Sequence, residues 1–177
     1  MGKSCLNKLS GNITVDCTIK PVGVKNIYLM HAEDVSTTAD SNTLSVLTAT
    51  VASGGVVILV EGYKQNIQIT GAARTMDASA KMDINVVFKM PRTLPGTIAR
   101  VRSILGGSFY VLAEYADGTN MFIGYTSPLE CSGVDWDSNA NAGLITVSLA
   151  APEGSAGNYF MGVAAAAVTT IKSKVGV

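Results

Sequence analysis

The stretch from Thr75 to Met90 reads TMDASAKMDINVVFKM, and its side chains alternate between apolar and polar. A period of two predicts an extended strand with one buried face and one face exposed to water. At about 3.3 Å per residue an unbroken strand of this length would span about 50 Å. Since that is roughly three times the length of an ordinary strand, the stretch predicts a long β-hairpin that bends sharply or projects beyond its own domain.

A projecting hairpin with one apolar face has to bury that face against another subunit, because a large exposed apolar surface is unfavourable in water. The stretch therefore predicts self-association rather than catalysis. The apolar positions expected to form the subunit interface are Met76, Met82, Ile84, Val86, Phe88 and Met90.

The composition is that of a weakly charged chain. Its 177 residues suit a single domain spanning 1–177. Apolar residues make up 47% and charged residues only 15%, below the roughly 25% of typical domains. This balance fits either a chain with a large permanent interface or a compact β protein rich in Gly and Ala. Thirteen basic and thirteen acidic side chains cancel, which argues against a strong nucleic-acid-binding surface.

Short segments of strand-forming residues are spread along most of the chain. The expected strands are 12–19, 24–30, 44–51, 56–63, 67–70, 108–115, 120–125, 129–136 and 144–149. The pair Asp117-Gly118 between two of them is a strong hairpin signal. The polar region 31–42 is expected to form an extended loop or arm. Residues 159–177 are expected to form a flexible C-terminal tail, since their alanines favour helix and their β-branched residues favour strand.

One segment changes from a period of two to helical spacing. Ile98, Val101 and Leu105 recur at the spacing of one helix face. Thr93 is suited to cap the start, and Gly106 follows the last apolar position. A helix over about 94–106 completes a mainly β fold class: an antiparallel β-sandwich or half-barrel with one α-helix and a long hairpin.

Residue types that carry catalysis are scarce. His31 is the only histidine, and no signature surrounds any Ser or Cys that it would need as a partner. The three cysteines, Cys5, Cys17 and Cys131, lack the paired spacing of a disulfide framework and are too few for a zinc site. Cys5 and Cys17 could pair, but reduced thiols are the simpler expectation. We therefore expect no catalytic residues, no cofactor, and a chain that is not an enzyme.

Two further sequence patterns bear on metal binding and on location. Asp135, Asp137 and Asn139 have the spacing of the first calcium-loop ligands, but Ala140 and Thr146 stand where the loop needs its Gly and Glu. We expect no metal site. The start of the chain has no apolar signal segment, and no run approaches the roughly 20 apolar residues of a membrane span. The expectation is synthesis in the cytoplasm and no membrane partner.

Residues 109–149 read FYVLAEYADGTNMFIGYTSPLECSGVDWDSNANAGLITVSL. A strand, an Asp-Gly turn, an aromatic return strand, a Pro step and a final alternating strand follow one another, preceded by the predicted helix. This arrangement, mainly over residues 93–150, resembles tail-tube-like structural proteins in the virions of tailed bacteriophages. The resemblance implies a β-sandwich or half-barrel whose hexameric rings stack into a tube. DNA would pass through this tube without sequence-specific contact. Its partners would be copies of itself and other tail proteins, and its location the virion tail.

Two alternative functions remain open from the sequence. The first is also a structural virion protein, but one that forms a head-to-tail adaptor or collar ring instead of the tail tube. The second is a β-sandwich module that binds carbohydrate or acts as an adhesin. Such a module needs exposed aromatic side chains on one platform, for which Tyr125 and Trp136 are the candidates.

Overall fold

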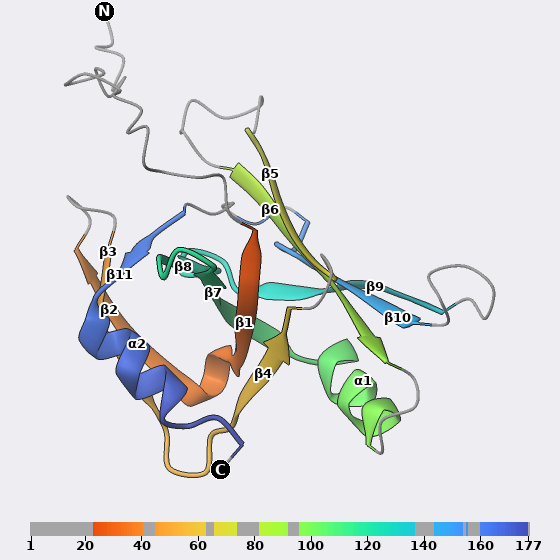
Figure 1. Ribbon diagram of the computed structural model, residues 1–177, viewed down its shortest axis with the longest axis horizontal. Coiled ribbons are helices and arrows are strands. Elements are labelled where there is room, and N and C mark those ends of the chain that lie inside the picture. Colours follow the sequence, from red (N-terminus) through yellow and green to blue (C-terminus); the bar gives the residue numbers. More distant parts are fainter. Residues whose placement is uncertain are drawn as a thin grey trace, which may run out of the picture.

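The computed structural model is mainly β and antiparallel, with two α-helices among the residues it describes (Figure 1). The structure describes residues 23–40, 45–62, 66–73, 82–91, 96–136, 144–153, 155 and 160–176. In chain order the elements are β1 (Val24–His31), the short 3-10 helix η1 (Ala32–Asp34), β2 (Val35–Asp40), β3 (Ser45–Val51), β4 (Val57–Glu61), β5 (Ile67–Ala73), β6 (Met82–Pro91), α1 (Thr97–Leu105), β7 (Ser108–Tyr115), β8 (Asn120–Ile123), β9 (Leu129–Trp136), β10 (Leu144–Ala150), β11 (Gly162–Val163) and α2 (Ala165–Lys172).

The larger sheet has eight strands in the order β4-β1-β7-β9-β10-β6-β5, with β8 beside β7. Its two end strands, β4 and β5, follow each other directly in the chain. The connection stays close to β1, because the Gly62 N–H donates to the Lys25 carbonyl oxygen at 2.7 Å. The sheet therefore curls until β5 approaches β1, which makes a half-barrel. A smaller sheet has the order β11-β3-β2.

Buried side chains form two cores, one on each side of β1 and β7. The first core fills the half-barrel and consists of Ile27, Leu29, Ile67, Ile84, Val86, Phe88, Ile104, Phe109, Val111, Ala113, Ile123, Leu129, Ile145, Val147 and Leu149. The second core lies between the half-barrel, the small sheet and α2, and consists of Tyr28, Met30, Val35, Val46, Ala49, Val51, Val57, Leu112, Phe122, Met161, Ala167 and Ile171.

Strand β1 shows how the sequence produces this layering. Ile27 and Leu29 point into the first core, while Tyr28 and Met30 point into the second. Successive side chains of a strand point to opposite faces, so a continuous apolar run is required where both faces are covered. The same holds for Val111, Leu112 and Ala113 on β7. These two strands are the shared wall of the sandwich.

Most strand predictions are confirmed within a few residues at their ends. The expected strands that the structure bears out are those at 24–30, 44–51, 56–63, 67–70, 108–115, 120–125, 129–136 and 144–149. The expected strand at 12–19 lies outside the described residues. The predicted helix is present as α1, shorter than expected at its start, where residues 94–95 are also outside the described part.

The prediction of a loop or arm over 31–42 is wrong for residues 35–40, which form β2. This strand pairs antiparallel with β3, from Val35 opposite Val51 to Asp40 opposite Ser45. Its exposed face carries hydroxyls, and the Thr38 and Thr48 side-chain oxygens are 2.6 Å apart. A strand with Ser and Thr on one face and Ala and Thr on much of the other has little hydropathy contrast. The alternation in β2 therefore gives only a weak hydropathy signal in the sequence.

The prediction of a flexible tail is also wrong where the structure describes it. The tail contains both β11 and a second helix, α2, beyond the one helix expected. Ala167 and Ile171, four residues apart, lie on one face of α2 and are buried in the second core. Helix-forming alanines and one strongly anchored Ile together explain why the helix forms here.

The Asp-Gly hairpin between β7 and β8 is confirmed, and its glycine has a left-handed backbone. The Asp117 carboxylate accepts hydrogen bonds from the Thr119 N–H at 2.9 Å and from its hydroxyl at 2.6 Å. Gly118 has φ = 87°, which a residue with a Cβ adopts at a cost of about 1–2 kcal/mol.

We expect Gly118→Ala to lower the free energy of unfolding by about 1 kcal/mol because of this backbone conformation. Urea denaturation would show a lower midpoint with an unchanged slope. Gly106→Ala is the matched control, since Gly106 has φ = −110° and no heavy atom lies within 4 Å of an added Cβ. Equal effects in the two variants would contradict the assignment.

Candidate functional site

The predicted subunit-interface residues divide into two groups in the structure. Ile84, Val86 and Phe88 have no exposed surface and belong to the first core. A side chain that its own chain covers completely has no surface left for another subunit, so these three are core residues, which corrects the sequence-based assignment. Met82 and Met90 are half-buried at the margin of that core. Met76 lies outside the described residues.

The outer part of the β5–β6 hairpin has few large side chains. Beyond Ile67, β5 exposes Gln68, Thr70 and the run from Gly71 to Ala73. A Cβ at Gly71 would lie 2.9 Å from Met82 Cε and 3.1 Å from Phe160 Cζ. Small and polar residues leave the backbone of β5 accessible.

The direction of the backbone groups on β5 follows from one hydrogen bond. The Lys89 N–H of β6 donates to the Asn66 carbonyl oxygen at 2.9 Å. Because backbone groups alternate in direction along an antiparallel strand, those of Gln68 and Thr70 also face β6. Those of Ile69 and Gly71 face the outer edge, where no strand among the described residues pairs with β5. Within the described ranges, β5 is therefore an edge strand of the half-barrel.

Strand β4 ends the sheet on the other side and is covered only at its start. The Val57 N–H donates to the Lys174 carbonyl oxygen at 3.3 Å, and the Gly176 N–H donates to the Val57 carbonyl oxygen at 3.4 Å. Past Val57, no second strand within the described ranges pairs with the outer side of β4. Among the described residues, β4 beyond Val57 and β5 therefore each have an outer side that no strand pairs with.

A hydrogen-bonded network around Glu114 fastens α2 to the half-barrel. The Glu114 carboxylate accepts from Lys172 Nζ at 2.8 Å, from the Tyr28 hydroxyl at 2.9 Å and from Asn26 Nδ2 at 3.1 Å. Lys172 Nζ also lies 5.4 Å from the centre of the Tyr28 ring. Burial acts to raise the pKa of Glu114, but these three donors outweigh it and lower the pKa from 4.5 to about 2. The network thus joins α2 to β1 and β7.

The residues considered for chemistry do not come together. The His31 ring packs on Phe109 with centroids 4.6 Å apart. Cys131 is a half-buried free thiol. Asp135 is exposed on β9, while its two predicted companions at 137 and 139 lie outside the described residues. Within the described ranges no three His, Cys, Asp or Glu side chains are grouped to hold a metal ion.

The two candidate aromatic residues do not belong to one cluster. Tyr125 is half-buried and packs against the second core. Trp136 is 55% exposed at the end of β9. An aromatic platform formed by this pair has no support in the geometry.

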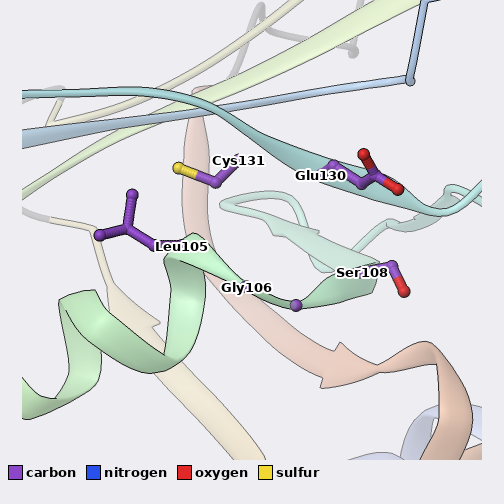
Figure 2. A pocket seen from close by; sticks show the side chains of 6 residues that line it. Leu105, Gly106, Ser108, Glu130 and Cys131 are labelled. Carbon is purple, nitrogen blue, oxygen red and sulfur yellow. The ribbon is translucent and has the colours of Figure 1, made fainter.

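A shallow groove lies where α1 ends and β9 begins (Figure 2). Its volume is about 230 Å³. The lining residues are Leu105, Gly106, Gly107, Ser108, Glu130 and Cys131. Leu105 and Cys131 point toward each other across the groove, from α1 and from β9. Sequence reasoning missed this groove because it depends on how far β9 extends past β7.

No helix in the part of the chain that the structure describes has the length and apolar character of a membrane span. No family model, curated protein or solved structure matches this chain.

Proposed function

We propose that this chain is a structural virion protein whose copies assemble into stacked hexameric rings that form a bacteriophage tail tube, through which DNA passes. One observation carries the proposal: the half-barrel has a self-contained core, while β4 and β5 are edge strands that no further described strand pairs with on the outer side. The unpaired backbone groups of an edge strand can pair with other chains, so they make a monomer prone to aggregation. In a closed ring each edge can pair with the edge of a neighbouring copy, which removes the hazard.

The arrangement of the hairpins supports stacking of such rings. In Figure 1 the strand ends that lead to the tips of the β2–β3 and β5–β6 hairpins lie in the upper half of the view. Helix α1, the connection between β3 and β4 and the C-terminus lie in the lower half. A subunit with two different ends stacks naturally in a head-to-tail manner, which generates an extended assembly rather than a closed pair.

The charge balance is consistent with a protein that does not bind DNA tightly. Equal numbers of acidic and basic side chains give no excess of Lys and Arg to neutralise phosphates. The scarcity of catalytic residue types points the same way, toward a structural function.

The experiment is electron microscopy and analytical ultracentrifugation of the purified chain over a range of concentrations. We expect rings that stack into tubes. The double variant Gln68→Lys/Thr70→Lys places charges on exposed positions of the β5 edge strand, and should abolish assembly without changing the urea midpoint of the monomer.

The matched control is Ala166→Lys, at an exposed position of α2, which should assemble like the unmodified chain. Rings that never stack would favour the adaptor or collar position over the tube. A chain that stays monomeric at every concentration would refute the proposal.

A further inference from the structure

We propose that residues 174–176 form a strap over the start of β4, and that this strap keeps a second copy of the chain from pairing with β4 until the strap is displaced. The inference rests on the proposed function, since it names what regulates ring closure at one edge of the half-barrel. Three observations support it: the strap occupies backbone groups that a partner strand needs, its hydrogen bonds are long, and its base is firmly held.

The strap is the part of the chain that follows α2 and runs beside the start of β4 (Figure 1). Val175 is the parallel bridge partner of Val57. The Lys174 carbonyl oxygen accepts a hydrogen bond from the Val57 N–H at 3.3 Å, and the Gly176 N–H donates to the Val57 carbonyl oxygen at 3.4 Å. Both backbone groups on the outer side of Val57 are therefore occupied.

The same side of β4 has further backbone groups beyond the strap. Backbone groups alternate in direction along an antiparallel strand, so those of Leu59 and Glu61 face outward like those of Val57. The Glu61 carbonyl oxygen accepts from Asn66 Nδ2 at 3.1 Å, a bond that a rotation of the Asn66 side chain releases. A strand laid along the whole length of β4 would pair with all three residues and would displace the strap at Val57.

The strap is held more weakly than a paired strand. Hydrogen bonds from N–H to oxygen are usually about 2.7–3.2 Å long in proteins, and both bonds between the strap and Val57 are longer. Val175 packs at the margin of the second core, and Gly176 is exposed. A partner strand that pairs with Val57, Leu59 and Glu61 makes more backbone bonds than it displaces. A second copy can therefore replace the strap by strand addition.

The base of the strap is held independently of β4. Ala167 and Ile171 of α2 are buried in the second core, and Lys172 Nζ lies 2.8 Å from the Glu114 carboxylate. A turn joins α2 to the strap, and in this turn the Lys174 N–H donates to the Ile171 carbonyl oxygen at 3.1 Å. The turn can open and release the strap while α2 stays docked.

The strap thus gives the chain two states at this edge. In the closed state the start of β4 is covered, which is one of the ways in which β proteins protect an edge strand from uncontrolled pairing. In the open state the whole edge is available to a second copy. A partner shifts the population toward the open state only as far as it binds that state more tightly than the closed one. The strap therefore raises the concentration at which copies assemble.

A disulfide that locks the strap in place tests this function. Val57 and Val175 are bridge partners, and adjacent strands lie about 4.8 Å apart, a distance that a disulfide can span. The double variant Val57→Cys/Val175→Cys is made together with Cys5→Ser, Cys17→Ser and Cys131→Ser, and its oligomers are followed by analytical ultracentrifugation and electron microscopy. The oxidised protein should stay monomeric at concentrations where the same protein assembles after reduction.

The reduced form of this variant is the matched control, because it differs from the oxidised form only by the cross-link. Equal assembly of the two forms would overturn the proposed regulation and leave the proposed function standing. Monomers at every concentration, in the unmodified chain and in all variants, would refute both proposals.

Release of the strap by a substitution at Gly176 tests the opposite direction. Gly176 has φ = 69° and donates its N–H to Val57. Proline has no N–H and a φ of about −65°, so Gly176→Pro should free the strap. We expect the concentration at which half of the chain is assembled to fall about fivefold, because the monomer loses weak hydrogen bonds that oppose assembly.

Gly176→Asn is the matched control for this substitution. Asparagine keeps the N–H and tolerates a left-handed backbone, and no heavy atom lies within 4 Å of an added Cβ. This variant should assemble like the unmodified chain. If Gly176→Pro assembles no more readily than Gly176→Asn, the strap does not hold assembly back.

Discussion

Replacing Ile84 by lysine is expected to unfold the chain itself, before any assembly takes place. Ile84 has no exposed surface and lies in the first core, where β6 pairs with β5 at Gly71. Loss of the apolar side chain costs about 2–5 kcal/mol, and burial of an unpaired ammonium adds to that cost. Since small domains are stable by only about 5–15 kcal/mol, most of the folded population should be lost. Circular dichroism and urea denaturation of the variant would show this.

Asn85→Lys is the matched control for this prediction. Asn85 is the next residue of β6, it is exposed, and it points to the opposite face of the strand. Its substitution should change the free energy of unfolding by no more than about 0.5 kcal/mol. If Ile84→Lys instead keeps the urea midpoint of the unmodified monomer and fails only to assemble, then another subunit covers the side chain, as the sequence pattern alone predicts.

The two possible results explain what the sequence around Ile84 does and does not determine. The alternation of apolar and polar residues predicts which side chains of β6 are buried. Ile84, Val86 and Phe88 are buried as expected. The alternation does not state which chain covers them. The coverage comes from strands distant in sequence, such as β7 and β10, and from α1. Strand order, rather than local pattern, decides between a core and an interface.

The predictions for β2 and for the C-terminal tail failed because of local features of the sequence. Strand β2 was missed because its Ser, Thr and Ala residues differ little in hydropathy between the two faces. The prediction of a flexible tail is wrong because the mixed helix and strand preferences belong to two successive elements, β11 and then α2. Where contrast between faces was high, as in β10 with Ile145, Val147 and Leu149, the prediction was correct to within a residue.

The candidate site could not be derived from the sequence in the same way. An open edge is the absence of a neighbouring strand, and this is a property of the whole sheet. Nothing in the residues of β4 and β5 indicates that two consecutive strands end up at opposite ends of the sheet. The groove at α1 likewise depends on the offset between β7 and β9.

Acid is expected to weaken the attachment of α2 through Glu114. The donors Lys172, Tyr28 and Asn26 lower the pKa of this carboxyl to about 2 from 4.5, so the folded chain binds its proton less readily than the unfolded chain. The resulting stability is fully present above pH 4.5 and is lost as the pH falls toward 2. We expect the free energy of unfolding to decrease by about 2 kcal/mol over this range, less than the full shift implies, because water reaches Lys172 and screens the pair.

Glu114→Gln distinguishes this network from the other carboxylates of the chain. The amide keeps the shape of the side chain but cannot be ionised, so the variant should be less stable at pH 7 and should lose less stability than the unmodified chain between pH 4.5 and pH 2. Urea denaturation at a series of pH values measures both effects, and an unchanged acid dependence would assign it to other groups. Because Ala167 and Ile171 hold α2 by apolar contacts that do not titrate, the helix itself should remain in acid. The loss should therefore appear as a weaker joint between α2 and the half-barrel, not as loss of the helix.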